Sequence, residues 1–239
     1  MVGTLPVGSE GGGLGPLFSR RHPEPVLLGR ETKHDHLVQE FDRMAEIYQV
    51  YVQPFSGPIF EEGLEAMTPY LQPDSRVMDA GCGPGRELQR VARLLPMGEV
   101  VGVDLAPGMV ITAHESARAH GLDNCAFFQA DVGDLSKAFR GRFDLVYSCL
   151  AHHHYPDPEA ATASVLGCLR PGGVYCVIDP GPAWFNAMSA PLSRLADPGW
   201  VGFHTPDEFC ELFLGTGFTR AAWLELLPGF GLAVGQAPT

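Results

Sequence analysis

The sequence predicts an α/β protein whose doubly wound sheet has seven strands, mostly parallel, with one late antiparallel strand and additional N-terminal helices. Two observations predict this fold. Short apolar runs alternate with glycine turns and with segments of helical periodicity, which is the pattern of βαβ units. Near the C-terminus, runs at 218–227 and 232–236 are joined only by a short PGFG turn. A connection that short joins antiparallel neighbours.

Five earlier apolar runs are the expected parallel strands. Parallel strands are covered by helices on both faces, so their sequences are almost continuously apolar. The runs cover residues 76–80, 100–105, 125–131, 143–150 and 173–180.

Apolar residues at helical spacing predict the helices between and before these strands. One face of a first helix consists of Leu37, Phe41, Met44, Tyr48 and Tyr51. Pro54 and the Ser-Gly-Pro of 56–58 are expected to end it. A second helix would then carry Phe60, Leu64, Met67 and Leu71, and later helices are expected at 88–95, 109–120, 160–169 and 206–217.

The chain of 239 residues divides into three predicted parts. Residues 1–34 are rich in glycine and proline and are expected to be a disordered tail. Residues 35–73 form a helical cap, and residues 74–239 form the α/β domain. The N-terminus lacks a signal-peptide pattern, and no apolar run is long enough for a membrane span, so a cytoplasmic location is expected.

The composition limits the classes of molecule that this protein is expected to bind. The formal net charge of −12 disfavours nucleic acid and anionic membrane surfaces, which bind clustered lysine and arginine. A small neutral or cationic molecule fits better. The six cysteines form no CxxC pair and no short zinc spacing, so we expect reduced cysteines and no metal site.

Acidic residues follow three successive strands at the sheet edge where open α/β proteins bind ligands. Asp79 precedes the glycine turn GCGPG, whose spacing is G-x-G-x-G rather than G-x-G-x-x-G. The negative charge of its carboxylate would attract an ammonium group of a ligand but would not stabilise a bound pyrophosphate. Asp104 lies about 20 residues further on, where a carboxylate can accept both ribose hydroxyls. Asp131 and Val132 follow the third strand and can bind the edge of an adenine.

On these residues the sequence resembles the class I S-adenosylmethionine-dependent methyltransferases, which have a Rossmann-like fold. The motifs occur in the family's order over about residues 36–238: VMDAGCGPG, VVGVDLAPGM, QADVGDL, FDLVYSCLAHHHYPDP and LRPGGVYCVID. The chain is most similar to the ubiquinone/menaquinone-biosynthesis type, in which FDRMAEIY resembles the N-terminal helix motif. Ala106 stands where the family commonly has serine, a change expected to affect helix capping.

The resemblance implies S-adenosylmethionine as cofactor, bound by residues 74–239, and a role for each matching residue. Gly81, Gly83 and Gly85 would hold the methionine part and Asp79 would face its ammonium. The other implied cofactor-binding residues are Asp104 on the ribose, Leu105 and Met109 beside the sugar and adenine, Asp131 and Val132 on the adenine, Cys149 at the methionine end, and Tyr48, with Tyr51 second, closing the site.

The implied reaction is methyl transfer to O, C or N of a small acceptor. The segment 179–204 would form the acceptor wall, and its aromatic and apolar residues suit an aromatic or hydrophobic metabolite: Trp184, Phe185, Met188, Trp200, Phe203 and His204. The alternative is a protein of the same fold that binds S-adenosylmethionine without methylating, such as a cyclase, a decarboxylase or a silent partner. The oligomeric state stays open, with a homodimer as one expectation.

Three consecutive histidines follow the fourth strand. The family pattern Leu-His-His-x-x-Asp-Pro places His153 and His154 on the usual pair and leaves His152 unexplained. We expect His153, with His154 second, to act as the general base, because imidazole titrates near neutral pH. A metal site is disfavoured because neighbours on an extended chain point apart, and it would need a further ligand such as His204 or an N-terminal acid.

Overall fold

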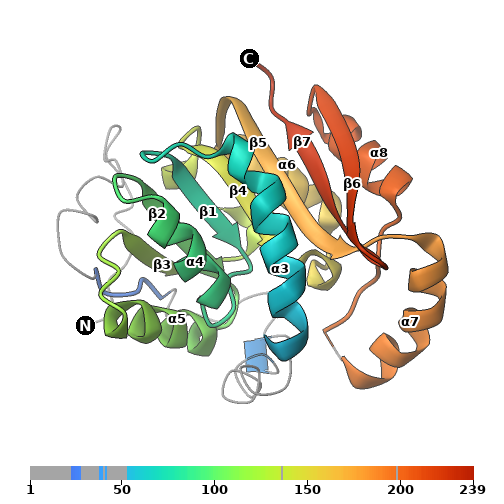
Figure 1. Cartoon of the computed structure of the whole chain (residues 1–239), viewed down its shortest axis with the longest axis horizontal. Helices are drawn as coiled ribbons and strands as arrows, with labels where there is room; N and C mark the ends of the chain where they lie inside the picture. Colours follow the sequence, from blue (N-terminus) through green and yellow to red (C-terminus); the bar gives the residue numbers. More distant parts are fainter. Residues whose placement is uncertain (1–22, 28–37, 40, 42–52, 136, 198) are drawn as a thin grey trace.

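The computed structural model describes residues 23–27, 38–39, 41, 53–135, 137–197 and 199–239. A seven-stranded sheet forms its centre, in the order β3-β2-β1-β4-β5-β7-β6 (Figure 1). Strand β7 pairs antiparallel with both β5 and β6, and the other pairs between the described strands are parallel. The predicted fold class is therefore confirmed, including the single late antiparallel strand.

The strands agree with the predicted runs to within a few residues, except at one end of the fifth. They are β1 (Arg76–Ala80), β2 (Glu99–Asp104), β3 (Cys125–Gln129), β4 (Phe143–Cys149), β5 (Leu169–Pro180), β6 (Arg220–Leu227) and β7 (Phe230–Gln236). Strand β5 begins four residues before its predicted start, because Leu169 already pairs with Phe143 before the register shifts. The parallel register, for example Val77 beside Val100 and Leu145, brings the carboxyl ends of β1, β2 and β4 to one edge.

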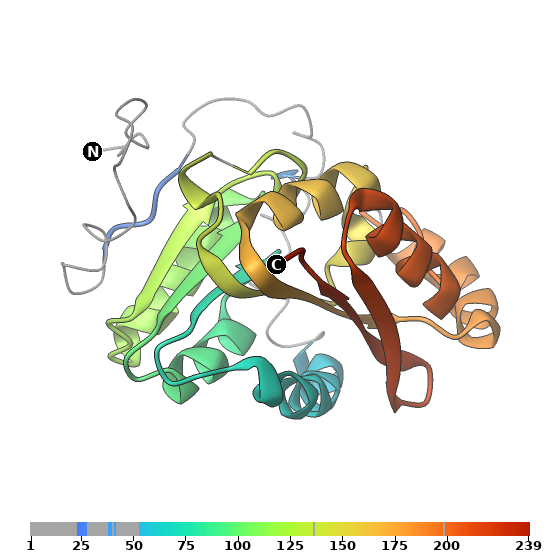
Figure 2. The same cartoon turned by 90° about the horizontal axis from the view of Figure 1, so that it is seen from above.

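Helices cover both faces of the sheet (Figure 2). On one face pack α3 (Gln53–Met67), α4 (Arg86–Leu94) and α5 (Pro107–Ala119). The other face is covered by α6 (Pro158–Cys168) and α8 (Pro206–Thr216). Each face has its own apolar core, so β1 to β5 are largely buried on both sides, as their sequences predicted, whereas the outer strand β6 has no buried residue.

The predicted break at Ser56-Gly57-Pro58 is wrong, because α3 begins at Gln53 and runs through it. Pro54 lies in the first turn, where a backbone N–H would have no intrahelical acceptor. Pro58 lies deeper in the helix and forfeits one backbone hydrogen bond. Burial of Phe60 and Met67 against the sheet keeps the segment helical despite that loss.

Part of the predicted tail lies along the sheet. Val26 forms a parallel bridge with Phe128 of the edge strand β3. Its N–H donates to the Phe127 carbonyl at 3.0 Å, and its carbonyl accepts from the Gln129 N–H at 2.7 Å. Tyr48 and Tyr51, and most of the first predicted helix, lie outside the described residues.

Helix α7 (Ala183–Ala196) lies beyond β6 and β7, away from the helices that cover the sheet (Figure 1). Several of its large apolar side chains are exposed: Trp184, Met188, Leu192 and Leu195. Among the helices that the structure describes, none is both long and apolar enough to cross a membrane.

Candidate cofactor and acceptor site

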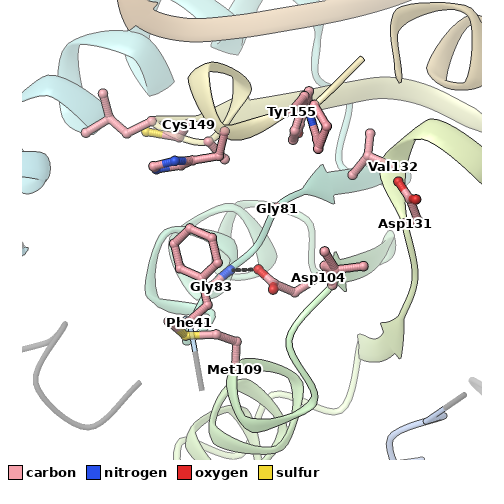
Figure 3. Close-up of a pocket in the computed structure, with 14 residues that line it drawn as sticks. Phe41, Gly81, Gly83, Asp104, Met109, Asp131, Val132, Cys149 and Tyr155 are labelled. Carbon is pink, nitrogen blue, oxygen red and sulfur yellow. Dashed lines mark hydrogen bonds between the residues drawn. The ribbon is translucent and has the colours of Figure 1, made fainter. Parts of the chain in front are cut away.

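A pocket opens at the carboxyl ends of β1 to β4 and brings together most of the predicted cofactor-binding residues (Figure 3). Its empty volume, with the open mouth included, is about 750 Å³. The predicted residues in its wall are Gly81, Gly83, Asp104, Leu105, Met109, Asp131, Val132, Cys149 and His154.

The glycine turn after β1 needs glycine for two different reasons. Gly81, Gly83 and Gly85 all have positive φ, at 84°, 50° and 79°. A Cβ on Gly81 would lie 2.7 Å from the Ala151 Cβ, and one on Gly85 would lie 2.7 Å from the Ala113 Cβ. A Cβ on Gly83 would meet nothing within 4 Å. Gly81 and Gly85 therefore allow the chain itself to pack closely, whereas Gly83 borders open space in the pocket.

Asp104 ties the glycine turn to the start of α5. Its Oδ2 accepts from the Gly83 N–H at 2.8 Å, and its Oδ1 accepts from the Ala106 N–H at 2.9 Å (Figure 3 shows the first of these). Ala106 is the N-cap of α5 and provides no side-chain cap, as its departure from serine predicted. Asp104 also lines the pocket, and a carboxylate oxygen can accept more than one hydrogen bond.

Asp131 and Tyr155 define the opposite end of the pocket. The Asp131 side chain accepts from the Gly133 N–H at 2.8 Å and caps a short 3-10 turn (Val132–Asp134). The buried Tyr155 hydroxyl donates to the Ala80 carbonyl at 2.7 Å and lies 3.0 Å from the Ser148 hydroxyl. These bonds connect the end of β1 to the end of β4, so the two strand ends form one wall.

A second, smaller hollow adjoins the first and shares Gly81, Gly83, Cys149 and Leu150 with it. Its remaining wall includes Asp79 and Glu87. Burial raises the pKa of Asp79 well above its usual value, against the effect of the Tyr147 hydroxyl, which donates to Asp79 at 2.8 Å. Burial also raises the pKa of Glu87. The buried Asp79 and the partly buried Glu87 place two carboxyl groups beside one hollow, which provides a site for a cation.

Leu150 connects the two hollows and carries local backbone strain. It is the only described residue other than glycine with a positive φ, at 50°. Its N–H donates to the Ile178 carbonyl at 2.8 Å, which ties this conformation to β5. A leucine in the left-handed region costs roughly 1–3 kcal/mol, and such strain concentrates at ligand sites.

The three histidines form a 3-10 turn, His152–His154, rather than an extended segment. The assumption that these side chains point apart along an extended chain is therefore wrong. His152 is 1% exposed, its two ring nitrogens have no hydrogen-bond partner, and its ring packs against His204 and Phe209. Burial lowers the pKa of His152 to about 3, so its imidazole is neutral.

His153 and His154 differ in their surroundings. His153 Nδ1 lies 2.7 Å from Asp179 Oδ1. Burial alone would lower the pKa of His153, but the charge and hydrogen bond of Asp179 outweigh it and raise the pKa. His154 lines the cofactor pocket, and burial, with the charge of His153, lowers its pKa to about 4. The structure thus places His154 at the pocket and His153 behind it, although the sequence favoured His153 as the base.

The predicted acceptor wall divides into two groups. Trp200, Phe203 and His204 lie at the histidine turn, with the Phe203 ring 5.2 Å from His153 and the His204 ring 5.3 Å from His152. Phe185 packs 5.1 Å from Phe230, whereas Trp184 is more than half exposed. The first group is therefore the part of the segment that lies next to the pocket.

Several residues of the site were not predicted from the sequence: Ser56, Glu87, Leu150, Ala151 and Tyr155. Phe41 also lines the pocket. It lies on the same predicted helix face as Tyr48, so that face could have indicated it. Glu87 in the first turn of α4, directly after the glycine loop, offered a similar positional signal.

Comparisons with known proteins agree with this geometry. A family model described as a methyltransferase domain matches residues 71–200. The trans-aconitate 2-methyltransferase of Deinococcus radiodurans is 37% identical over 173 residues, which cover 70% of this chain and 62% of that protein. The ubiquinone biosynthesis O-methyltransferase of Xanthomonas campestris is 36% identical over 159 residues, covering 64% of each chain. The matches thus span less than two thirds of both relatives.

The solved DhpI–SAH complex has the same fold, with a TM-score of 0.68 at 22% identity, covering 87% of this chain and 99% of that one. Together these comparisons confirm the predicted methyltransferase family and the fold class. This chain belongs to the methyltransferase domain family.

Proposed function

We propose that this protein transfers a methyl group from S-adenosylmethionine to O, C or N of a small aromatic or hydrophobic metabolite. One observation carries the proposal: a single pocket joins the glycine turn, the acids after β2 and β3, and a histidine after β4. The first three suit the cofactor, and the histidine suits an acceptor that must lose a proton.

The residues present fit the cofactor. The smaller hollow, with Asp79 and Glu87, would bind the methionine ammonium. The carboxylate of Asp104, which lines the pocket, would bind the ribose hydroxyls. Asp131 and Val132 would take the adenine edge, with Met109 and Leu105 beside the rings.

When bound, the cofactor supplies an electrophilic methyl group on its sulfonium. The residues of the chain then have to place the acceptor atom in line with that methyl, and proximity and orientation account for several kcal/mol of such catalysis. Phe41 and Tyr155 border the pocket and would exclude water. His154 is the candidate base because its ring lies in the wall, and His153, held by Asp179, would support it from behind.

Aromatic side chains next to the histidine turn support the acceptor class. Trp200 and Phe203 pack against each other with ring centroids 5.3 Å apart, and Phe41 meets His154 edge-on at 5.1 Å. Flat apolar walls of this kind bind aromatic rings through stacking and burial. The two curated relatives are named for trans-aconitate and for ubiquinone biosynthesis, and the second name agrees better with these walls.

The test is incubation with methyl-labelled S-adenosylmethionine and a panel of phenols, quinols and aromatic amines, followed for S-adenosylhomocysteine and for label in the acceptor. We expect transfer to at least one member of the panel. Asp104→Ala is the cofactor-site control and should remove transfer, whereas Asp207→Asn on the exposed surface of α8 should not. Tight cofactor binding without transfer to any acceptor would contradict the proposal and favour a non-methylating protein.

A further inference from the structure

His153, His154 and Asp197 converge in space, although Asp197 lies more than forty residues further along the chain. One ligand-type atom from each side chain lies within 4.8 Å of the other two. The loop after α7 carries Asp197 to this place, and it is fastened to the histidine turn because the Val201 N–H donates to the His153 carbonyl at 2.8 Å.

The separation of His154 and Asp197 suits two ligands of one ion better than a direct contact. His154 Nε2 lies 3.6 Å from Asp197 Oδ2, which is too long for a hydrogen bond. Zn–N and Zn–O bonds of about 2.0–2.2 Å at a tetrahedral angle put the two ligand atoms roughly 3.4 Å apart. The observed spacing is therefore close to that of a coordinated pair.

Two further groups orient these ligands. Asp179 Oδ1 binds His153 Nδ1 at 2.7 Å, which leaves Nε2 as the ring nitrogen for an ion. The Gly199 N–H donates to Asp197 Oδ1 at 3.1 Å, while Oδ2 is the oxygen nearer to His154. Metal-bound histidines and carboxylates typically carry such outer hydrogen bonds, which fix the ring and the carboxylate in place.

Some buried polar atoms around the histidine turn also lack hydrogen-bond partners. Buried polar atoms without one occur at His154 Nδ1, Asp179 Oδ2 and Trp200 Nε1. Buried polar groups of this kind are rare in folded proteins and indicate a missing water, ion or ligand. None of these atoms is a proposed ligand, and the Trp200 N–H can only donate, so their partners would be water molecules beside the ion.

We propose that His153, His154 and Asp197 bind a divalent transition-metal ion of the Zn²⁺ class. Two imidazole nitrogens and one carboxylate oxygen form a ligand set that suits zinc and leaves a fourth position for water or substrate. Asp179 acts as a positioning residue through His153.

The position of the ion would matter for the reaction, and this step rests on the proposed function. His154 lines the cofactor pocket, so an ion bound to it lies one side chain away from the methyl donor. An acceptor hydroxyl bound to such an ion would lose its proton to water more readily, because the ion stabilises the oxyanion that remains. The ion would then replace the free imidazole of His154 as the group that prepares the acceptor.

The test uses the full chain without a histidine tag, stripped with EDTA and titrated with Zn²⁺ by calorimetry, with Co²⁺ absorption as a second measurement. We expect one ion per chain and a tetrahedral Co²⁺ spectrum. His154→Gln and Asp197→Asn should each weaken binding at least tenfold, and Asp179→Asn should weaken it by about 10- to 100-fold. His120→Gln is the matched control, because His120 is the exposed C-cap of α5 and its Nδ1 lies 2.8 Å from the Ser116 carbonyl.

Asp197 does not line either cofactor hollow, so Asp197→Asn should bind S-adenosylhomocysteine like the parent chain and unfold at the same temperature. That measurement separates a lost ion site from a lost fold and from a failure of the proposed function. Absence of stoichiometric Zn²⁺ binding would overturn the ion site, as would binding that is equal in the parent, His154→Gln and Asp197→Asn chains.

Discussion

The two sides of the site differ in how their polar groups are satisfied. On the cofactor side, the chain's own hydrogen bonds already engage Asp79, Asp104 and Asp131. On the acceptor side, around the histidine turn, buried polar atoms lack partners on six residues: His152, His154, Asp179, Asn186, Trp200 and His204. The cofactor side is thus held by hydrogen bonds of the chain itself, whereas the acceptor side contains buried polar atoms that the chain leaves without hydrogen bonds.

The difference also shows which part of the protein is costly to fold. An unsatisfied buried polar atom costs about 1–3 kcal/mol. The unsatisfied atoms on the acceptor side therefore lower the free energy of unfolding, and such costs are expected at a ligand site. Four substitutions test this difference between the two sides.

The largest effect is expected for Gly81→Ala on the cofactor side. The residue would combine a left-handed backbone with a Cβ 2.7 Å from the Ala151 Cβ. We expect a loss of roughly 3 kcal/mol in the free energy of unfolding, measured in urea, and loss of S-adenosylhomocysteine binding. The control is Gly121→Ala, which shares a positive φ of 67° but has no atom within 4 Å of the added Cβ. If both variants lost the same free energy of unfolding, the contact between the added Cβ and Ala151 would not explain the effect of Gly81→Ala.

Next is Asp104→Ala, which removes the acceptor that joins Gly83 to Ala106. We expect S-adenosylhomocysteine affinity to fall at least tenfold, about 1.4 kcal/mol, by calorimetry. Asp207→Asn should bind like the parent chain. If Asp104→Ala kept its affinity, Asp104 would not belong to the cofactor site.

Asp79→Asn should weaken cofactor binding about fivefold, close to 1 kcal/mol, because it removes the charge facing the ammonium. It should also change how stability depends on pH. The folded pKa of Asp79 is raised by burial, so the parent chain loses ligand-free stability as pH rises from about 4 through that raised pKa. The variant lacks this loss and should be the more stable chain at neutral pH without ligand. Urea melts of both chains at several pH values test the sign, and parallel curves would contradict it.

The smallest effect is expected at His152. Replacing this buried imidazole, whose nitrogens lack partners, by leucine removes a desolvation cost, so we expect a gain of about 1 kcal/mol in the free energy of unfolding. His120→Leu on the surface should change it by less than about 0.5 kcal/mol. A loss of stability in His152→Leu would mean that the imidazole has a partner in solution.

The sequence predicted which residues meet at the first pocket better than it predicted the surroundings of the histidine turn, because the signals for the pocket are local. A glycine turn at a strand end and acids after successive strands are fixed by strand order alone, and all of them meet at one edge of the sheet. Tyr155 and Glu87 were missed because their roles depend on which atoms lie opposite them, such as the Ala80 carbonyl.

The acceptor side was predicted less well because it depends on contacts between distant segments. No residue near Asp197 in the sequence indicates that Asp197 lies beside His154. The three histidines form a 3-10 turn, whereas the sequence analysis expected an extended segment. The predicted start of α3 was wrong for a related reason, because tertiary packing of Phe60 outweighed the local effect of Pro58.

The bridge at Val26 has a consequence for self-association. Strand β3 is an outer strand of the sheet, and an outer strand with free backbone groups can pair with a strand from another molecule. Val26 occupies the Phe127 carbonyl and the Gln129 N–H, so the chain blocks this edge with its own N-terminal segment. A version of the protein shortened past Val26 would uncover those groups and gain a route to aggregation that the full chain closes.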